Sequence, residues 1–372
     1  MKNTKILNHL KIKLRNPNID FIRIAGMFSI IISHILIHGK AIKKYNKYIE
    51  LNLLYILSMW HVSSFGVISG LVGSKKNRYS NLLYLWIIVV FYSLVFYVKY
   101  NIKYLKPPVL NDIIKANIFP VIYKYYWYFT AYFGIYPFLS IIKSGMAILS
   151  HIEVKKSIYF MIGIFIIWNF YNRDTFLLNS GQSSFCILIF YVFGSYFDKY
   201  IFYREHNTFI KIIICIICSI IYLFLSLITY KINIQKSFFK SHSKIKNFFQ
   251  IHVNSFPIVF QTFSITIFIA QIKFNIYSTK IITFLGPLTF DIYLIHENLY
   301  IRRYYMTNIL NQYSSNLNLL LVLLLIFEKG FIIFIICVFF AYIRSIIFRI
   351  FQIKYICIYL EEMVTKLIYY LI

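Results

Sequence analysis

Long apolar runs recur along the whole chain of 372 residues, and the charged residues cluster between them. Hydrophobic residues make up 60% of the sequence and charged residues only 14%, and the mean hydropathy is +0.68. These values exclude an ordinary soluble domain. Runs of about 17 to 25 apolar residues cross a bilayer as helices, because lipid offers no partner to an exposed backbone group. The sequence therefore predicts an all-α, polytopic integral membrane bundle.

Hydropathy places about ten transmembrane helices in this bundle. The last of them is the least regular, because Glu328 and Lys329 interrupt its apolar run. We divide the chain into a transmembrane domain at residues 1–345 and a basic, amphipathic C-terminal segment at 346–372. The ten expected spans are 20–38, 51–73, 80–98, 121–142, 157–171, 182–197, 209–229, 255–272, 281–300 and 318–345.

The N-terminal region favours a first span that is retained in the membrane. Its charged start is too long for a cleavable signal peptide, and the apolar run that follows has no small-residue cleavage site. Lys and Arg are slightly more frequent in the loops that would share the side of the N-terminus. We therefore expect a multi-pass protein of the cell membrane with a cytoplasmic N-terminus.

The formal net charge of +27 is spread over loops on both predicted faces. Without a concentrated basic domain, this charge favours lipid headgroups or anionic substrates as partners over nucleic acid. The five cysteines all lie in apolar segments, and an odd number there argues against a disulfide framework. Cys215 and Cys218 have CxxC spacing but no second ligand pair, so we predict no metal site.

The first predicted span, "IDFIRIAGMFSIIISHILIHG" at residues 19–39, contains four ionisable side chains. At about 100° per residue, Arg23 and His34 return to within about 20° of one face, about 16 Å apart along the helix axis. Asp20 and His38 fall within about 40° of His34 on the same face. Interfacial charges and a hydrogen-bonded packing histidine are one interpretation. Ionisable groups aligned within a membrane also indicate a polar path facing a cavity, and the alignment favours that interpretation.

These residues resemble a known family. Arg23 and His34 reproduce the R-x10-H pattern on the first span of the acyltransferase-3 family, multi-spanning membrane enzymes that O-acylate the sugars of surface glycans. The likeness extends in order over about residues 20 to 340. Three further segments resemble the family's motifs: "FGVISGLVGSKKNR" at 65–78, "YYWYFTAYFGIYPFL" at 125–139 and "FLGPLTFDIYLIHENLYIRR" at 284–303.

Two positions depart from the family's pattern. Leu71 stands where an aromatic residue commonly follows Ser-Gly, and Asp291 stands where a small residue often precedes "YLIH". The first bears on the passage of the acyl donor, and the second adds a polar group near the site. We therefore count Asp291, together with Asp20, as a further polar residue of the predicted site.

The resemblance implies acyl transfer from a thioester to a sugar hydroxyl, which needs a base that works near neutral pH. Histidine is the side chain with such a pKa, and His34 is the candidate base. Asp20 lies about 21 Å away along the helix and cannot orient it. Glu297 and His296 on the ninth span are the candidates for that role, with interfacial anchoring as the alternative.

The resemblance also implies a binding region for the donor near the cytoplasmic end of the first span. Arg23 is the candidate for contacting its phosphates, because a guanidinium binds phosphate oxygens in pairs. Lys75, Lys76 and Arg78 add positive charge on that side, although basic residues end many cytoplasmic helices. Ser69 and Trp127 are candidates for lining the donor passage. Close helix packing is the alternative for Ser69, and an interfacial aromatic belt is the alternative for Trp127.

Together these features predict a membrane O-acyltransferase, most simply an O-acetyltransferase. Acetyl-CoA would be the donor substrate and no bound cofactor is expected. The acceptor would be a glycan or a lipid-linked sugar in the biosynthesis of an exopolysaccharide, capsule or other surface glycan. The alternative is a non-catalytic polytopic glycan flippase or exporter, which needs positive charge along its path but no imidazole at a fixed place.

Overall fold

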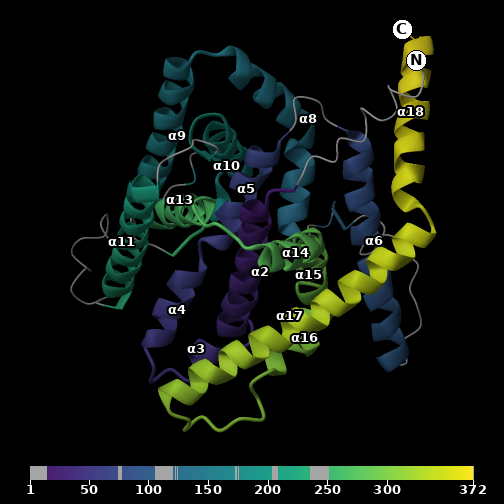
Figure 1. Ribbon diagram of the computed structural model, residues 1–372. Coiled ribbons are helices and arrows are strands. Elements are labelled where there is room, and N and C mark those ends of the chain that lie inside the picture. The colour runs from purple at the N-terminus through teal and green to yellow at the C-terminus, as the bar shows by residue number, and fades with distance from the viewer. Residues whose placement is uncertain are drawn as a thin grey trace.

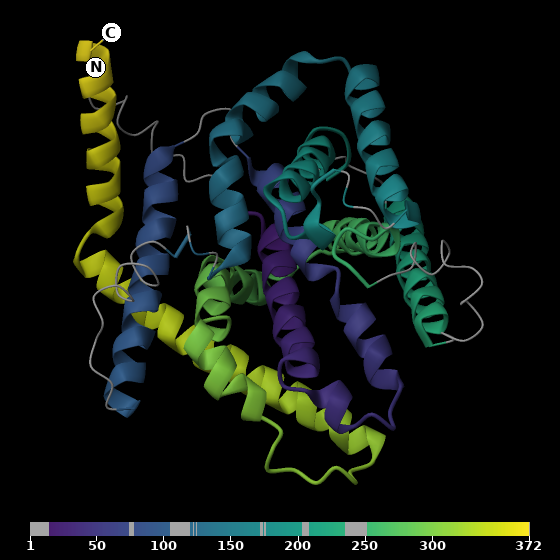
Figure 2. The same cartoon turned by 180° about the vertical axis from the view of Figure 1, so that it is seen from behind.

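The computed structural model describes residues 15–73, 78–104, 120–121, 123, 125–171, 174, 176–202, 208–234 and 251–371. Within these ranges the chain is all-helical and forms no strand, as the sequence predicts. Figures 1 and 2 show the helices from opposite sides. The longer ones are α2 (Pro17–Ile37), α4 (Glu50–Ser58), α5 (His61–Val72), α6 (Tyr79–Tyr104), α8 (Trp127–Ile148), α9 (His151–Tyr171), α10 (Ser184–Phe197), α11 (Thr208–Ile234), α13 (Phe256–Ala270), α14 (Ile276–Leu285), α15 (Thr289–His296), α17 (Leu319–Ile350) and α18 (Ile353–Leu371).

Five helical segments are long and apolar enough to cross a membrane. They support an integral membrane protein, but they do not confirm the expected count of about ten spans. The apolar helix Phe256–Ala270 is shorter than a typical span, and the apolar stretch Ile216–Ile232 lies within the longer helix α11. The five segments are Pro17–Lys44, Glu50–Val72, Tyr79–Lys103, Trp127–Ile148 and Leu319–Ile350.

The span expected at 281–300 is not one helix. A 3₁₀ turn, η5 (Gly286–Leu288), separates α14 from α15, and α15 ends at His296. Pro287 within this turn has no backbone N–H to continue the hydrogen-bond ladder of α14. Asn298 then accepts a hydrogen bond from the Tyr300 N–H at 3.1 Å and begins the short helix α16 (Leu299–Tyr304). The break leaves Glu297 as the buried C-cap of α15, where its side chain can turn toward a neighbouring helix.

The last expected span, 318–345, forms one long helix. Glu328 and Lys329 interrupt its apolar run in the sequence, but α17 continues through both residues to Ile350. The Lys329 Nζ lies 3.2 Å from the Glu328 Oε1, and the ammonium also lies over the Tyr313 ring, 5.3 Å from its centre. The two charges therefore compensate each other locally, and helix 319–350 is continuous despite them.

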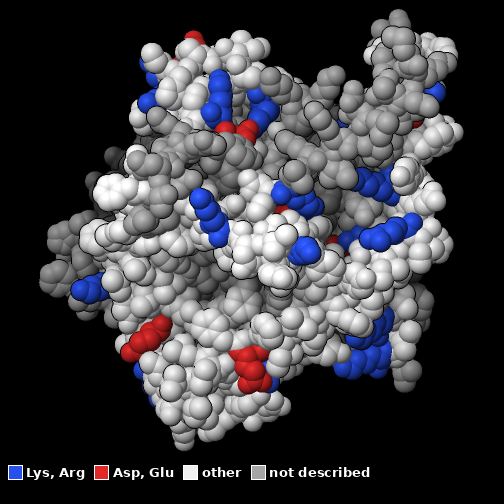
Figure 3. Space-filling model, in the orientation of Figure 1, with Lys and Arg blue, Asp and Glu red and all other residues white. Residues whose placement is uncertain are grey.

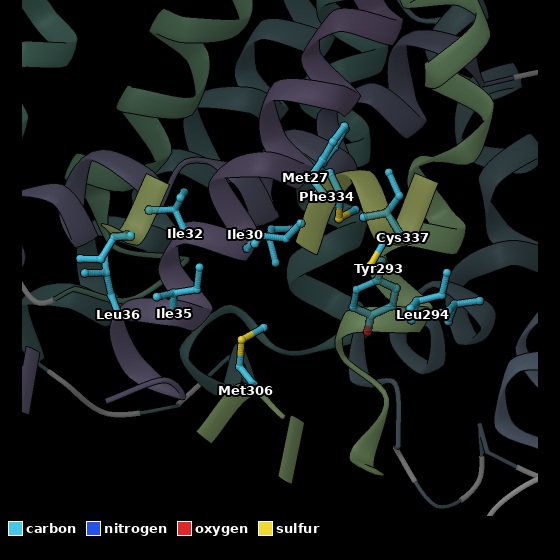
Figure 4. Packing of buried hydrophobic residues seen from close by; sticks show 14 of the residues in the cluster. Met27, Ile30, Ile32, Ile35, Leu36, Tyr293, Leu294, Met306, Phe334 and Cys337 are labelled. Atoms are coloured by element: carbon cyan, nitrogen blue, oxygen red, sulfur yellow. The ribbon is translucent and has the colours of Figure 1, made fainter. Parts of the chain in front are cut away.

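Helix α2 lies at the centre of the bundle in both views, against α5, α14, α15 and α17. Its first half, with Ile19 and Ile22, belongs to a hydrophobic cluster shared with α5, α10 and α13. Its second half belongs to another cluster, shared with α15 and α17. Figure 4 shows this second cluster, in which Met27 and Ile30 lie near Phe334 and Tyr293. Burial on both sides fixes the rotation of α2, and hence the direction in which its polar stripe points.

A pair of glycines lets α5 and α10 approach closely. A Cβ atom on Gly70 would lie 2.6 Å from the backbone N of Ser195, and one on Gly194 would clash with the Val67 carbonyl. Small residues permit such contact between helices in lipid, where close packing replaces the hydrophobic effect as the source of association. Gly70, the neighbour of Ser69 in the sequence, therefore has the close-packing role that was the alternative for Ser69.

Helix α18 leaves the bundle and runs beside α6 (Figure 1). The Glu361 carboxylate accepts hydrogen bonds from the backbone N–H groups of Tyr79 at 2.7 Å and Ser80 at 3.1 Å, at the start of α6. Partial burial acts to raise the pKa of Glu361, but the hydrogen bonds from Ser80 and Tyr79 outweigh it, so the pKa is lowered. This carboxylate thus caps the first turn of α6 from another helix.

Candidate active site

A cavity of about 250 Å³ lies between α2, α5, α8 and α15. Arg23 and His34 both line it, as their spacing on one face of α2 predicts. The opposite wall comes from α8 and α15, which bring aromatic rings and the Glu297 carboxylate to the same space. The polar side chains on its walls are Arg23, His34, His61, Ser69, Trp127, Tyr128, Tyr132, Thr289, Tyr293 and Glu297.

His34 and Glu297 form the central contact of this cavity. The His34 Nδ1 lies 2.9 Å from the Glu297 Oε1, and the Glu297 side chain is only 9% exposed. The other carboxylate oxygen, Oε2, lies 3.3 Å from the Arg302 NH1. A carboxylate beside Nδ1 favours a proton on that nitrogen, which leaves Nε2 with the lone pair that a base requires. The structure therefore brings together the two residues that the sequence placed on different spans.

His296 approaches the same pair from α15. Its ring centre lies 5.3 Å from that of His34, and its Nδ1 donates a hydrogen bond to the Ile292 carbonyl at 2.6 Å. Its Nε2 is buried and has no hydrogen-bond partner among the described residues. His38, the C-cap of α2, also lies next to His34, with ring centres 4.9 Å apart. The rings of His296 and His38 thus both lie beside that of His34, which contacts the carboxylate.

The same residues offer a possible set of metal ligands. One ligand atom each from His34, His296 and Glu297 lie within 4.8 Å of one another. Two imidazoles and a carboxylate can bind a zinc-type ion. The Arg302 guanidinium beside Glu297, however, already places one positive charge at the carboxylate, which disfavours a second cation there. A bound ion would also take the His34 lone pair out of proton transfer, so our prediction of a metal-free site stands as a prediction.

Arg23 lines the cavity near the other end of α2 and is anchored by Asp20. The Arg23 NH1 lies 2.6 Å from the Asp20 Oδ1, and Arg15 makes two hydrogen bonds of 2.7 Å to the same carboxylate. Asp20 is 1% exposed and packs against Gly286, where a Cβ atom would collide with its carboxyl group. Asp20 does not line the cavity. Its position is that of a residue that orients Arg23 toward it.

The structure separates the other predicted site residues into three groups. Ser69 and Trp127 line the cavity, and the Ser69 hydroxyl donates to the Phe65 carbonyl. Arg78 is exposed and does not line the cavity. Lys75 and Lys76 lie outside the described residues.

Asp291 lies on the far side of α15 from this cavity. Its carboxylate forms a two-pronged ion pair with Arg344 of α17, through Nε at 2.6 Å and NH2 at 2.7 Å. Tyr92 of α6 donates a further hydrogen bond at 2.9 Å. Asp291 and Arg344 are 1% and 5% exposed. This departure from the family's usual small residue is therefore a buried link among α6, α15 and α17.

Sequence reasoning missed two residues that contribute to the site. His61 begins α5, is 3% exposed and lines the cavity, with its Nδ1 donating to the Ser58 carbonyl. Arg302 follows Glu297 in the motif "ENLYIRR". Its five-residue separation from Glu297 across a helix break hides the pairing, because no regular periodicity connects residues on the two sides of such a break.

Fold and site together define a helical membrane protein with a carboxylate–imidazole pair, suited to proton transfer, on the wall of an intramembrane cavity. The chain belongs to the acyltransferase-3 family: the family profile for the acyltransferase domain matches residues 16–350. It is a membrane acyltransferase. Comparison with curated proteins and with solved structures found no match.

Proposed function

We propose that this protein is an O-acetyltransferase of the cell membrane that moves an acetyl group from acetyl-CoA to a sugar hydroxyl of a surface glycan. The observation that carries the proposal is the contact of 2.9 Å between the His34 Nδ1 and the Glu297 Oε1 on a cavity wall that also bears Arg23. One cavity thus holds an imidazole that can act as a base, a carboxylate that can orient it and a cation suited to phosphate.

The reaction requires one proton to move twice. The sugar hydroxyl oxygen attacks the thioester carbonyl carbon, and the His34 Nε2 takes the hydroxyl proton while Glu297 stabilises the resulting imidazolium. The C–S bond then breaks, and the imidazolium returns the proton to the leaving sulfur. The products are the sugar acetyl ester and the free thiol of coenzyme A. Arg302 adds a positive charge beside Glu297 through its contact with Oε2 at 3.3 Å.

The donor would enter from the Arg23 end of the cavity. Arg23 and His34 are eleven residues apart on one helix, so the phosphates and the thioester would be separated by about 16 Å along α2. An extended donor with its charge at one end and its reactive carbon at the other suits this separation. With the N-terminus in the cytoplasm, the Arg23 end faces the compartment that contains acetyl-CoA.

The test compares His34→Gln, Glu297→Gln and the matched control His151→Gln on the exposed start of α9. Cells carrying each variant at equal membrane levels are assayed by NMR for acetyl esters on the surface glycan, before and after mild alkali. We expect His34→Gln to lower acetylation about 10²–10⁴-fold, because positioned proton transfer contributes that much. The control should retain full acetylation, and purified His34→Gln protein should still bind acetyl-CoA.

Near-normal acetylation by His34→Gln would overturn the mechanism. It would also favour the alternative function, a glycan flippase or exporter, which needs no base at this position. His38→Gln provides a graded comparison, because the His38 ring lies 4.9 Å from that of His34 at a tilt, while the ion pairs of Glu297 among the described residues are with His34 and Arg302. We expect its loss of acetylation to be clearly smaller than that of His34→Gln.

A further inference from the structure

A second, larger cavity of about 710 Å³ lies on the other side of α15. Its walls come from α6, from the segment that includes α16, and from α17. Its volume is within the range of about 300–1,000 Å³ that is usual for sites of small organic ligands. The acyl-transfer chemistry proposed above uses the first cavity and assigns nothing to this one.

The walls of the second cavity are mainly hydrocarbon. Phe91 and Phe96 of α6 face Ile332, Ile336 and Phe340 of α17 across it. Several of these groups are also on the outside of the bundle: Ile336 is 48% and Phe340 47% exposed. Both α6 and α17 are candidate membrane spans, so this cavity is bordered by bilayer-facing side chains. A groove of this kind suits a long hydrocarbon chain that enters sideways from the lipid.

Positive charge and aromatic rings gather at the end of the groove near the C-terminus of α6. Lys99 lines the groove, and its Nζ lies 5.9 Å from the centre of the Tyr305 ring, while that of Lys103 lies 5.1 Å from the same ring. Figure 3 shows Lys and Arg side chains grouped over this end of α6. Lysine ammonium groups attract phosphate, and an aromatic ring offers a face for a sugar.

The inner wall of the groove includes His296, which lies beside His34 of the first cavity. His296 lines the groove, is fully buried, and has a free Nε2, while its ring centre is 5.3 Å from that of His34 in the first cavity. The first cavity therefore reaches His34 and the groove reaches His296, and these two rings lie side by side. A hydroxyl presented from the groove and a thioester presented from the first cavity would meet at His34.

We infer that the groove between α6, α16 and α17 binds the acceptor as a sugar carried on a long-chain polyprenyl phosphate lipid. The isoprenoid chain lies between α6 and α17, the phosphate lies at Lys99, and the sugar hydroxyl reaches the histidines. This inference rests on the proposed function for the transfer itself. The hydroxyl oxygen forms the ester bond, its proton passes through His34 to the leaving sulfur, and the lipid link is unchanged.

The experiment measures binding without any catalysis. Purified protein in phosphatidylcholine nanodiscs is titrated with a tritium-labelled polyprenyl phosphate, in the absence of acetyl-CoA. We expect saturable binding to the wild-type protein and a Kd about tenfold or more higher for Ile336→Trp, because the added ring fills the groove. Ile335→Trp is the matched control: Ile335 is also 48% exposed on α17 but does not line the groove. Lys99→Ala should raise the Kd about fivefold.

Competition identifies the source of the affinity. Unlabelled phosphatidylglycerol and glucose 1-phosphate should each compete poorly, because one lacks the isoprenoid chain and the other lacks any chain. Equal competition by phosphatidylglycerol would overturn the inference and assign the groove to bulk anionic lipid. Absence of saturable binding, or equal affinity in Ile336→Trp and wild type, would also overturn it. His34→Gln should bind the probe normally, so a failure here is distinct from a failure of the proposed catalytic mechanism.

Discussion

The ion pair between Asp291 and Arg344 should be the most costly polar contact of the bundle to break. Asp291→Asn keeps the shape of the side chain but removes its charge, so it leaves the Arg344 guanidinium, which is 5% exposed, without a carboxylate. Two charge-assisted hydrogen bonds of 2.6 and 2.7 Å are weakened at once. Removing one member of a buried ion pair costs about 3–5 kcal/mol. We expect Asp291→Asn to lower the free energy of unfolding by that amount.

A double-mutant cycle measures the interaction free energy between Asp291 and Arg344 separately from the contacts that each makes with other residues. Arg344→Met alone should also be strongly destabilising, since it leaves the Asp291 carboxylate uncompensated. The double variant Asp291→Asn with Arg344→Met leaves no buried charge, so its cost should fall at least about 2 kcal/mol below the sum of the two single costs. Arg344→Lys retains the charge but not the paired hydrogen bonds of the guanidinium, and should lower the free energy of unfolding by about 1–2 kcal/mol.

The assay is unfolding of the purified protein in mixed micelles with increasing sodium dodecyl sulfate, followed by far-ultraviolet circular dichroism. Leu324→Ala on the lipid-facing side of α17, where Leu324 is 57% exposed, serves as the control and should unfold near the wild-type midpoint. A cost below about 1 kcal/mol for Asp291→Asn, or simple additivity in the cycle, would refute the reasoning. Such a result would mean that α15 is held in place by its apolar contacts alone.

Two further predictions concern the ends of the bundle. Arg23→Ala should raise the KM for acetyl-CoA about tenfold or more and Arg23→Lys should restore part of the affinity, because a guanidinium–phosphate contact is worth about 1.5–3 kcal/mol. Steady-state kinetics measure this KM, and the control Arg349→Ala, at an exposed position, should leave it unchanged. An unaltered KM in Arg23→Ala would show that Arg23 does not belong to the donor site. Glu361→Gln should weaken amide protection of Tyr79 and Ser80 at the start of α6 by at most about 1 kcal/mol at pH 7, with Glu362→Gln as control. The folded-state pKa of Glu361 is lowered, so its contribution is fully present above the usual Glu pKa of about 4.3 and is lost as pH falls through the lowered folded-state pKa. A difference as large in acid as at pH 7 would contradict the capping role.

The sequence alone determined that this is a helical membrane protein, and it determined which residues share the polar face of the first helix. Apolar runs of membrane-spanning length leave helices as the available structure, and a period of 3.6 residues places Arg23 and His34 on one face whatever lies around them. The motif containing His296 and Glu297 was also visible as a partner for His34. These are local properties, which depend on neighbours along the chain.

The tertiary structure decided which of these residues meet. The break at Pro287 turned one expected span into α14 and α15, and the end of α15 after His296 carried Glu297 to within 2.9 Å of His34. Asp291, which the sequence suggested as part of the site, instead pairs with Arg344 on α17. Contacts of this kind join segments far apart in the chain, and they depend on how helices rotate and pack against each other. Periodicity within one helix carries no information about that packing, because it fixes the face of a residue but not the helix that the face meets.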